Sequence, residues 1–146
     1  MVPESEIEFT VWGEPVPQGR ARFARRGNFV TTYDPEKSRN YKHDVKLAAI
    51  QVKPETPLEG PISLTVKVFR SIPKSFGKKK VAQALAGELR PITKPDLKNI
   101  ITGIEDALKG IIWKDDSQVV DFGKSSKWYS ENPRVEVVIK ERAANK

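Results

Sequence analysis

The chain contains no cysteine and only one histidine, His43, among its 146 residues. The absence of thiols excludes disulfide frameworks, zinc sites built on thiolates and cysteine nucleophiles. A single histidine also excludes metal sites that need several imidazoles. No segment approaches the roughly 20 apolar residues of a membrane-spanning helix, so we expect no membrane partner. The first residues do not resemble a signal peptide, so we expect a cytoplasmic protein.

Positive charge is what the chain has in excess. It carries 26 Lys and Arg residues against 19 Asp and Glu, which gives a formal net charge of +7. That excess favours a polyanionic partner, such as nucleic acid or an anionic membrane surface. The length fits one domain, which we expect to span residues 1–141, followed by a flexible tail at residues 142–146.

Hydrophobic periodicity predicts both strands and helices. Ile62, Leu64, Val66 and Val68 alternate with polar residues, which is typical of a half-buried strand. Further strands are predicted at 7–12, 118–124 and 134–141, a hairpin turning at Gly27-Asn28 within 20–32, and helices at 34–51, 78–86 and 96–109. There is no internal repeat. This order predicts an α+β fold, with a small mixed sheet and hairpins packed against two to three helices.

The segment from 94 to 121 concentrates acidic residues. Asp96 and Asp106 fall on one stripe of the predicted helix 96–109, and Asp115 and Asp116 follow it. Gathered carboxylates are hard oxygen ligands suited to Mg²⁺, with Mn²⁺ as a substitute. Such an ion can polarise a phosphate and activate a water.

Simpler structural roles explain the same residues. Asp96 has the position of a helix N-cap, and Asp115 begins a polar turn. Glu105 and Lys109 are spaced as a surface ion pair on one helix. On the pattern alone, both interpretations of the acidic segment stay open.

The acidic segment resembles the RusA family of Holliday junction resolvases. The matching stretches are Lys94-Pro95-Asp96-Leu97-x-Asn99, Asp106-Ala107-Leu108-x-Gly110 and Asp115-Asp116-Ser117-Gln118-Val119. The resemblance implies a small homodimer that binds four-way DNA junctions and cuts paired phosphodiester bonds with Mg²⁺. Many members of the family are encoded by prophages. A two-fold enzyme suits two symmetric cuts.

The resemblance assigns the candidate site residues. It implies Asp96 and Asp116 as catalytic residues and metal ligands. To these we add Lys98 as a catalytic residue that takes the role of a missing lysine, and Asp106 and Asp115 as further metal ligands. Asn99 is assigned to DNA binding.

Two positions depart from the family motif, because Lys98 occupies a usual Asp position and Thr102 a usual Lys position. A cation at a ligand position weakens binding of a divalent metal unless its side chain points away. Three explanations stay open: Lys98 replaces the missing lysine, the protein binds junctions without cutting them, or it acts on a different branched substrate.

Two basic clusters are predicted to contact phosphates. The first is Arg20, Arg22, Arg25 and Arg26 on the predicted hairpin. The second comprises Lys74, Lys78, Lys79 and Lys80 in and before the helix 78–86. Such contacts fix a protein on DNA without reading bases. For the second cluster, a solvated charged loop is an equally good explanation.

Overall fold

The computed structural model describes residues 5–17, 22–26, 29–33 and 36–142. The strands are β1 (Ser5–Trp12), β2 (Arg22–Arg26), β3 (Phe29–Tyr33), β4 (Ile62–Ser71), β5 (Val119–Asp121), β6 (Ser126–Ser130) and β7 (Arg134–Glu141). The helices are α1 (Glu36–Ile50), α2 (Lys78–Leu85) and α3 (Leu97–Leu108), with a 3₁₀ turn at Asp116–Gln118. The predicted α+β class is confirmed.

A mixed five-stranded sheet forms the centre of the molecule. Its order is β1-β7-β4-β5. Strand β6 also pairs with β4, further along that strand than β5 does. Strand β7 runs antiparallel to both β1 and β4, whereas β5 and β6 run parallel to β4. The parallel pairs need a long crossover from β4, and the segment that holds α2 and α3 supplies it.

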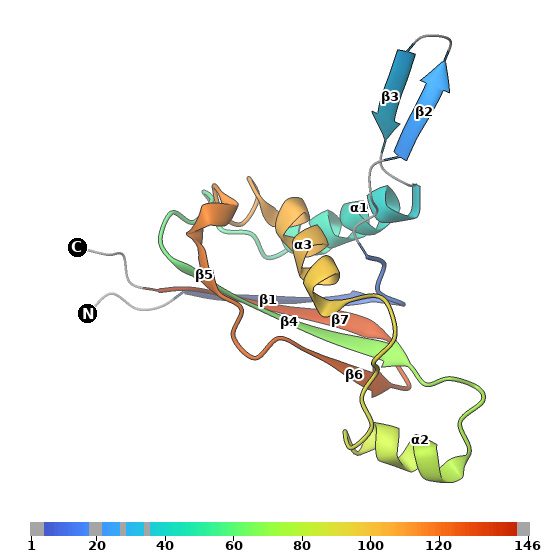
Figure 1. Cartoon of the computed structure of the whole chain (residues 1–146). Coiled ribbons are helices and arrows are strands. Elements are labelled where there is room, and N and C mark those ends of the chain that lie inside the picture. Colours follow the sequence, from blue (N-terminus) through green and yellow to red (C-terminus); the bar gives the residue numbers. More distant parts are fainter. Residues whose placement is uncertain (1–4, 18–21, 27–28, 34–35, 143–146) are drawn as a thin grey trace.

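The core lies between the sheet and two helices. Figure 1 shows α1 and α3 on the same face of the sheet. Ile62, Leu64, Val66 and Val68 of β4 are fully buried, as the alternating pattern predicted. Because successive strand residues point to opposite faces, Ser63, Thr65 and Lys67 lie on the face without these helices.

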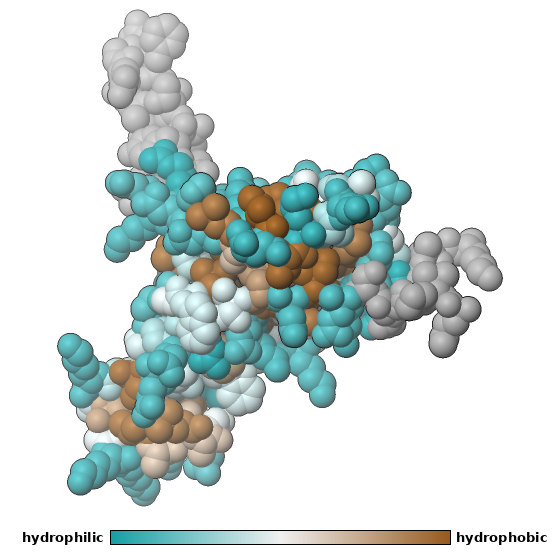
Figure 2. All heavy atoms as spheres, turned by 180° about the vertical axis from the view of Figure 1, so that it is seen from behind, coloured by the Kyte–Doolittle hydropathy of each residue, from teal (hydrophilic) through white to brown (hydrophobic). Residues whose placement is uncertain are grey.

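Two elements extend away from the central sheet. Strands β2 and β3 form a separate antiparallel pair in which Arg26 lies opposite Phe29. The predicted hairpin is therefore confirmed, although its turn lies outside the described residues. Helix α2 extends at the other end, beyond β6 (Figure 1). Figure 2 shows apolar side chains gathered over α2, with hydrophilic ones on both sides.

The sequence predicted most elements, but it missed one strand. The strand predicted at 118–124 is interrupted, because only Val119–Asp121 pairs with β4 before a turn at Gly123. Strand β6, of sequence SKWYS, then resumes the pairing. The expected helix start at Asp34 and Pro35 lies outside the described residues. Within the described ranges, no helix is both long and apolar enough to cross a membrane.

Candidate active site

Helix α3 positions the acidic segment. Its apolar stripe, which includes Ile100, Ile104 and Leu108, is buried against the core. Pro95 precedes the helix, and Gly110 ends it with φ +82°. A positive φ is costly for residues with a Cβ, so a glycine suits this turn. The helix is therefore fixed in place, with its polar stripes directed outwards.

Asp96 occupies the N-cap position but does not cap the helix with its side chain. Among the described residues, its carboxylate accepts no hydrogen bond from the backbone N–H groups of the first turn, and the residue is exposed. The N-cap role predicted from the sequence therefore explains the backbone position of Asp96 but not its side chain. Its carboxylate is available for other contacts.

The loop before Asp96 is held by two cations that the sequence did not single out for this role. Arg70 Nη1 donates to the carbonyl oxygen of Lys94 at 2.8 Å, and Lys127 Nζ donates to that of Thr93 at 2.8 Å. Burial and the charge of Arg70 lower the pKa of Lys127, and the negative charge of Asp96 opposes that shift. Asp96 therefore lies in a positive environment.

Asp116 lies near the other end of α3, where a hydrogen bond links it to a core residue. The fully buried Trp113 donates from its indole Nε1 to Asp116 Oδ1 at 2.9 Å. Burial raises the pKa of the half-buried Glu105, and the nearby charge of Asp116 raises it further. This end of the helix therefore brings two carboxylates near each other.

The other two predicted ligands have structural partners. Asp106 Oδ2 accepts from Lys42 Nζ on α1 at 2.6 Å. Asp115 accepts from Ser117 Oγ at 2.6 Å and lies 3.4 Å from Lys109 Nζ. Lys109 thus pairs with Asp115, which differs from the Glu105–Lys109 pair that the helical spacing suggested.

The length of α3 separates the predicted ligands. The helix has 12 residues, and at 1.5 Å per residue it spans about 18 Å. Asp96 precedes its first turn, whereas Asp106, Asp115 and Asp116 lie around its last turns and the following loop. Accordingly, the described residues of one chain hold no group of three or more Asp, Glu, His or Cys residues that could bind a metal ion. Asp96 and Asp116 are therefore held near opposite ends of α3.

The predicted phosphate-binding residues lie in the two extensions. Arg22, Arg25 and Arg26 belong to β2, whose side chains are outside the described part, and Arg20 is outside it entirely. Lys78, Lys79 and Lys80 are exposed on the first turn of α2, and Lys74 is exposed just before it. Lys80 Nζ lies 5.4 Å from the ring centre of Phe76, which packs edge-on against Tyr129.

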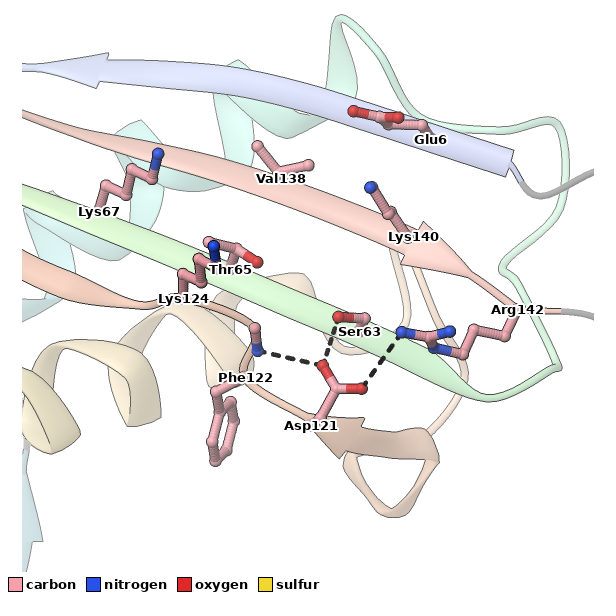
Figure 3. Close-up of a pocket in the computed structure, with 11 residues that line it drawn as sticks. Glu6, Ser63, Thr65, Lys67, Asp121, Phe122, Lys124, Val138, Lys140 and Arg142 are labelled. Atoms are coloured by element: carbon pink, nitrogen blue, oxygen red, sulfur yellow. Dashed lines mark hydrogen bonds and ion pairs between the residues drawn. The ribbon is translucent and has the colours of Figure 1, made fainter.

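The open face of the sheet holds further cations that were not predicted from the sequence. A shallow hollow of about 650 Å³ lies over β1, β7 and β4 (Figure 3). Ser63 donates to Asp121, and hydrogen bonds from Ser63 and the Gly123 backbone lower the pKa of that carboxyl. Cationic side chains around the hollow are Lys67, Lys124, Lys140 and Arg142. For Lys67 in β4 and Lys140 in β7, alternation with core residues was the available signal.

Comparison with known proteins places the chain in a nuclease family. The family model described as "Endodeoxyribonuclease RusA" matches residues 13–140. The chain therefore belongs to the RusA endodeoxyribonuclease family. A relative in Bacillus subtilis (strain 168), the uncharacterized protein YqaN, is 54% identical over 140 residues. That match covers 94% of this chain and 98% of YqaN.

Proposed function

We propose that this protein is a structure-specific endonuclease that cuts four-way DNA junctions by paired, symmetric hydrolysis of phosphodiester bonds. Membership of the RusA endodeoxyribonuclease family supports this substrate and reaction. The single structural observation that carries the proposal is Asp96. Its uncapped, exposed carboxylate lies beside cations at the start of α3, where a phosphate can approach.

The acidic and basic residues take separate roles in this proposal. Asp96 and Asp116 are the catalytic carboxylates, and Mg²⁺ or Mn²⁺ is the cofactor, which would activate a water when bound. Asp106 and Asp115 remain proposed additional ligands. Helix α3 separates Asp96 from the other three carboxylates, and the described residues of one chain hold no group of three or more such ligands. Lys98 supplies a further cation on α3.

DNA binding is assigned to the two extensions and to α3. The arginines of β2 and the lysines of α2 would contact phosphates on the arms of the junction, which orients the duplexes without reading their sequence. Asn99, in the first turn of α3, would contact the DNA strand near Asp96. Two symmetric cuts require two copies of the site, so a homodimer is the proposed assembly.

A junction-binding protein without cleavage is the second candidate. The motif departures favour it, because Lys98 and Thr102 stand where the family has an acid and a lysine. The lack of a three-carboxylate group in the described chain also favours it. Both candidates predict preference for a junction over linear duplex.

Incubation with an end-labelled four-way junction separates the two candidates. With Mg²⁺ or Mn²⁺ we expect nicks at symmetric positions in two opposite strands, and none with EDTA or with Asp96→Asn. Linear duplex of the same sequence is the substrate control. Binding without nicks, followed by nicks from the Lys98→Asp variant, would establish the second candidate. Equal affinity for junction and duplex would contradict both.

A further inference from the structure

We propose that Ile92 is an apolar wedge that inserts between bases at the branch point of a DNA junction, beside the strand that Asp96 approaches. The inference rests on the proposed function, since it names how the protein would bind the centre of its branched substrate. Ile92 lies in the loop between α2 and α3, four residues before Asp96. The loop thereby gains a role that is separate from the phosphate contacts assigned to the lysines of α2.

The side chain of Ile92 is almost entirely exposed. Its exposed fraction is 93%, and among the described residues the next most exposed large apolar side chain is Trp12 at 69%. A single exposed apolar side chain is common on a protein surface and needs no explanation by itself. Here, however, Pro91 before it is buried, whereas Thr93 and Lys94 after it are exposed. The chain therefore emerges from the interior at Ile92.

The loop before Ile92 is fixed by Arg90. Its Nε donates to the carbonyl oxygen of Lys127 at 2.6 Å, and its guanidinium carbon lies 3.4 Å from the ring centre of Trp128. Pro91 follows, and its ring restricts φ. The backbone therefore reaches Ile92 in a defined direction.

The loop after Ile92 is fixed through its backbone carbonyls. Lys127 Nζ donates to the carbonyl oxygen of Thr93, and Arg70 Nη1 donates to that of Lys94, each at 2.8 Å. The backbone is thus held on both sides of Ile92. Insertion of a side chain that is already held in place costs little conformational freedom, so the loop is preorganised for binding.

Ile92 is also close to the candidate catalytic carboxylate. Lys127, which holds the carbonyl of the next residue, Thr93, lies near enough to Asp96 to respond to its charge. Four residues of chain span at most about 14 Å, which corresponds to about four base steps along one DNA strand. A wedge at Ile92 would therefore open the DNA within a few nucleotides of the phosphate that Asp96 approaches.

The charges around Ile92 favour DNA as the occupant. Its cationic neighbours in the loop and the strands that hold it are Arg70, Arg90, Lys94 and Lys127. Lys94 is exposed, and no ion pair of it is found among the described residues. Proteins that kink DNA insert apolar side chains between base steps and offset the lost stacking by further contacts. Insertion costs least where pairing is already interrupted, as at a branch point.

The emission of 2-aminopurine in a bound junction tests the insertion. This base emits weakly when stacked and strongly when unstacked, and the measurement is made in EDTA so that no strand is cut. With saturating wild-type protein, we expect the emission to rise for a probe at the branch point and to stay unchanged for a probe in linear duplex. Ile92→Ala should lose most of that rise. Ile92→Leu keeps a side chain of similar size and should retain it.

Leu47→Ala on α1 is the matched control, because Leu47 is also a large apolar side chain, with 49% of its surface exposed. This control should keep the wild-type emission. The wedge is wrong if emission does not rise with the wild-type protein bound, or if it rises equally with Ile92→Ala. A loss of the rise in the Leu47→Ala variant as well would also contradict it, because the effect would then not be specific to Ile92.

Cleavage of a junction that is opened in advance tests what the insertion achieves. Unpaired thymines at the branch point remove the pairing that the wedge has to break. At saturating protein with Mg²⁺, we expect Ile92→Ala to cut the fully paired junction about tenfold more slowly than the wild type does, because the scissile phosphate is misplaced. Both proteins should cut the opened junction at similar rates. Equal slowing on the two junctions would contradict the opening role.

The two experiments fail in distinguishable ways. If the wild-type protein cuts no junction, the proposed nuclease function fails, while 2-aminopurine emission still decides the insertion. If the wild-type protein cuts junctions but Ile92→Ala leaves the emission unchanged, the nuclease function stands and the wedge is wrong.

Discussion

Asp116 and Asp96 differ in how strongly they are tied to the fold. Asp116 accepts a hydrogen bond from the buried indole of Trp113, whereas the side chain of Asp96 makes no capping hydrogen bond with its own helix. The first residue therefore serves both stability and the proposed chemistry. The second can be changed with little effect on folding. Any mutational test of the site has to separate these two effects.

Substitution of Asp116 should depend on which group replaces the carboxylate. Asp116→Ala leaves the buried Trp113 N–H without an acceptor, which should cost about 1–3 kcal/mol of unfolding free energy. Asp116→Asn keeps an amide oxygen as acceptor and should cost well under half as much, while removing the charge. Urea unfolding followed by Trp fluorescence measures both. Equal losses for the two variants would mean that the hydrogen bond contributes little.

Among the individual elements, helix α2 forms a basic extension of the molecule. Its first turn is a run of three exposed lysines, and its attachment to the body is mainly through β6. Arg90 lies over the ring of Trp128 in β6, 3.4 Å from the ring centre, and Gly87 lies so close to that ring that a Cβ would come within 3.0 Å. The position of the lysines is therefore fixed by aromatic packing behind them.

Removing these lysines should weaken DNA binding and reduce its dependence on salt. Each lost phosphate contact reduces the slope of log K against log [salt] by about 0.9. For Lys78, Lys79 and Lys80 changed together to Ala, we expect lower junction affinity and a shallower slope. Fluorescence anisotropy at several salt concentrations measures both quantities.

The matched control removes Lys46 and Lys53, which are exposed on α1 and the loop after it. This control should leave the slope unchanged. An unchanged slope in the α2 variant would instead show that the three lysines contact solvent alone.

Elements with strong periodicity were predictable from the sequence, and the arrangement of the candidate site was not. The alternation in β4 and the apolar stripe of α3 follow from burial of one face, so they are readable along the chain. Strand β6 was missed because its pairing with β4 depends on partners far away in the sequence. The ion pairs Lys42–Asp106 and Lys109–Asp115 also depend on tertiary packing. The motif identified the acidic residues, but only the fold shows how far apart α3 holds them.

At the scale of the whole molecule, the net charge of +7 conceals a spatial division. Two clusters of basic residues lie in the extensions, whereas Asp96 lies at one end of α3 and Asp106, Asp115 and Asp116 lie near the other. One chain therefore carries the proposed phosphate-binding residues in its extensions, and its candidate carboxylates lie at opposite ends of α3. The proposed homodimer would present two copies of the candidate site, which matches the two-fold symmetry of a four-way junction.

Cleavage should consequently depend on protein concentration. If cleavage needs the proposed homodimer, the rate per chain falls on dilution below the dimer dissociation constant, because a monomer cannot make paired cuts. Single-turnover cleavage at a series of protein concentrations, with junction kept at trace levels, measures this dependence. Comparison with the dissociation constant from sedimentation is the control. A rate per bound chain that stays constant after dissociation would indicate a complete site in one chain.

The attachment of the α2–α3 segment to β6 has a consequence for where DNA is cut. The same strand holds Arg90 against Trp128 and places Lys127 on the carbonyl of Thr93, three residues before Asp96. The lysines proposed to contact phosphates and the carboxylate proposed to act on them are therefore both supported by β6. In the proposed activity, the distance between these lysines and Asp96 would determine which phosphate is cut. For the proposed activity, the protein would select the scissile phosphate by its distance along the DNA arm, whatever the bases at that position.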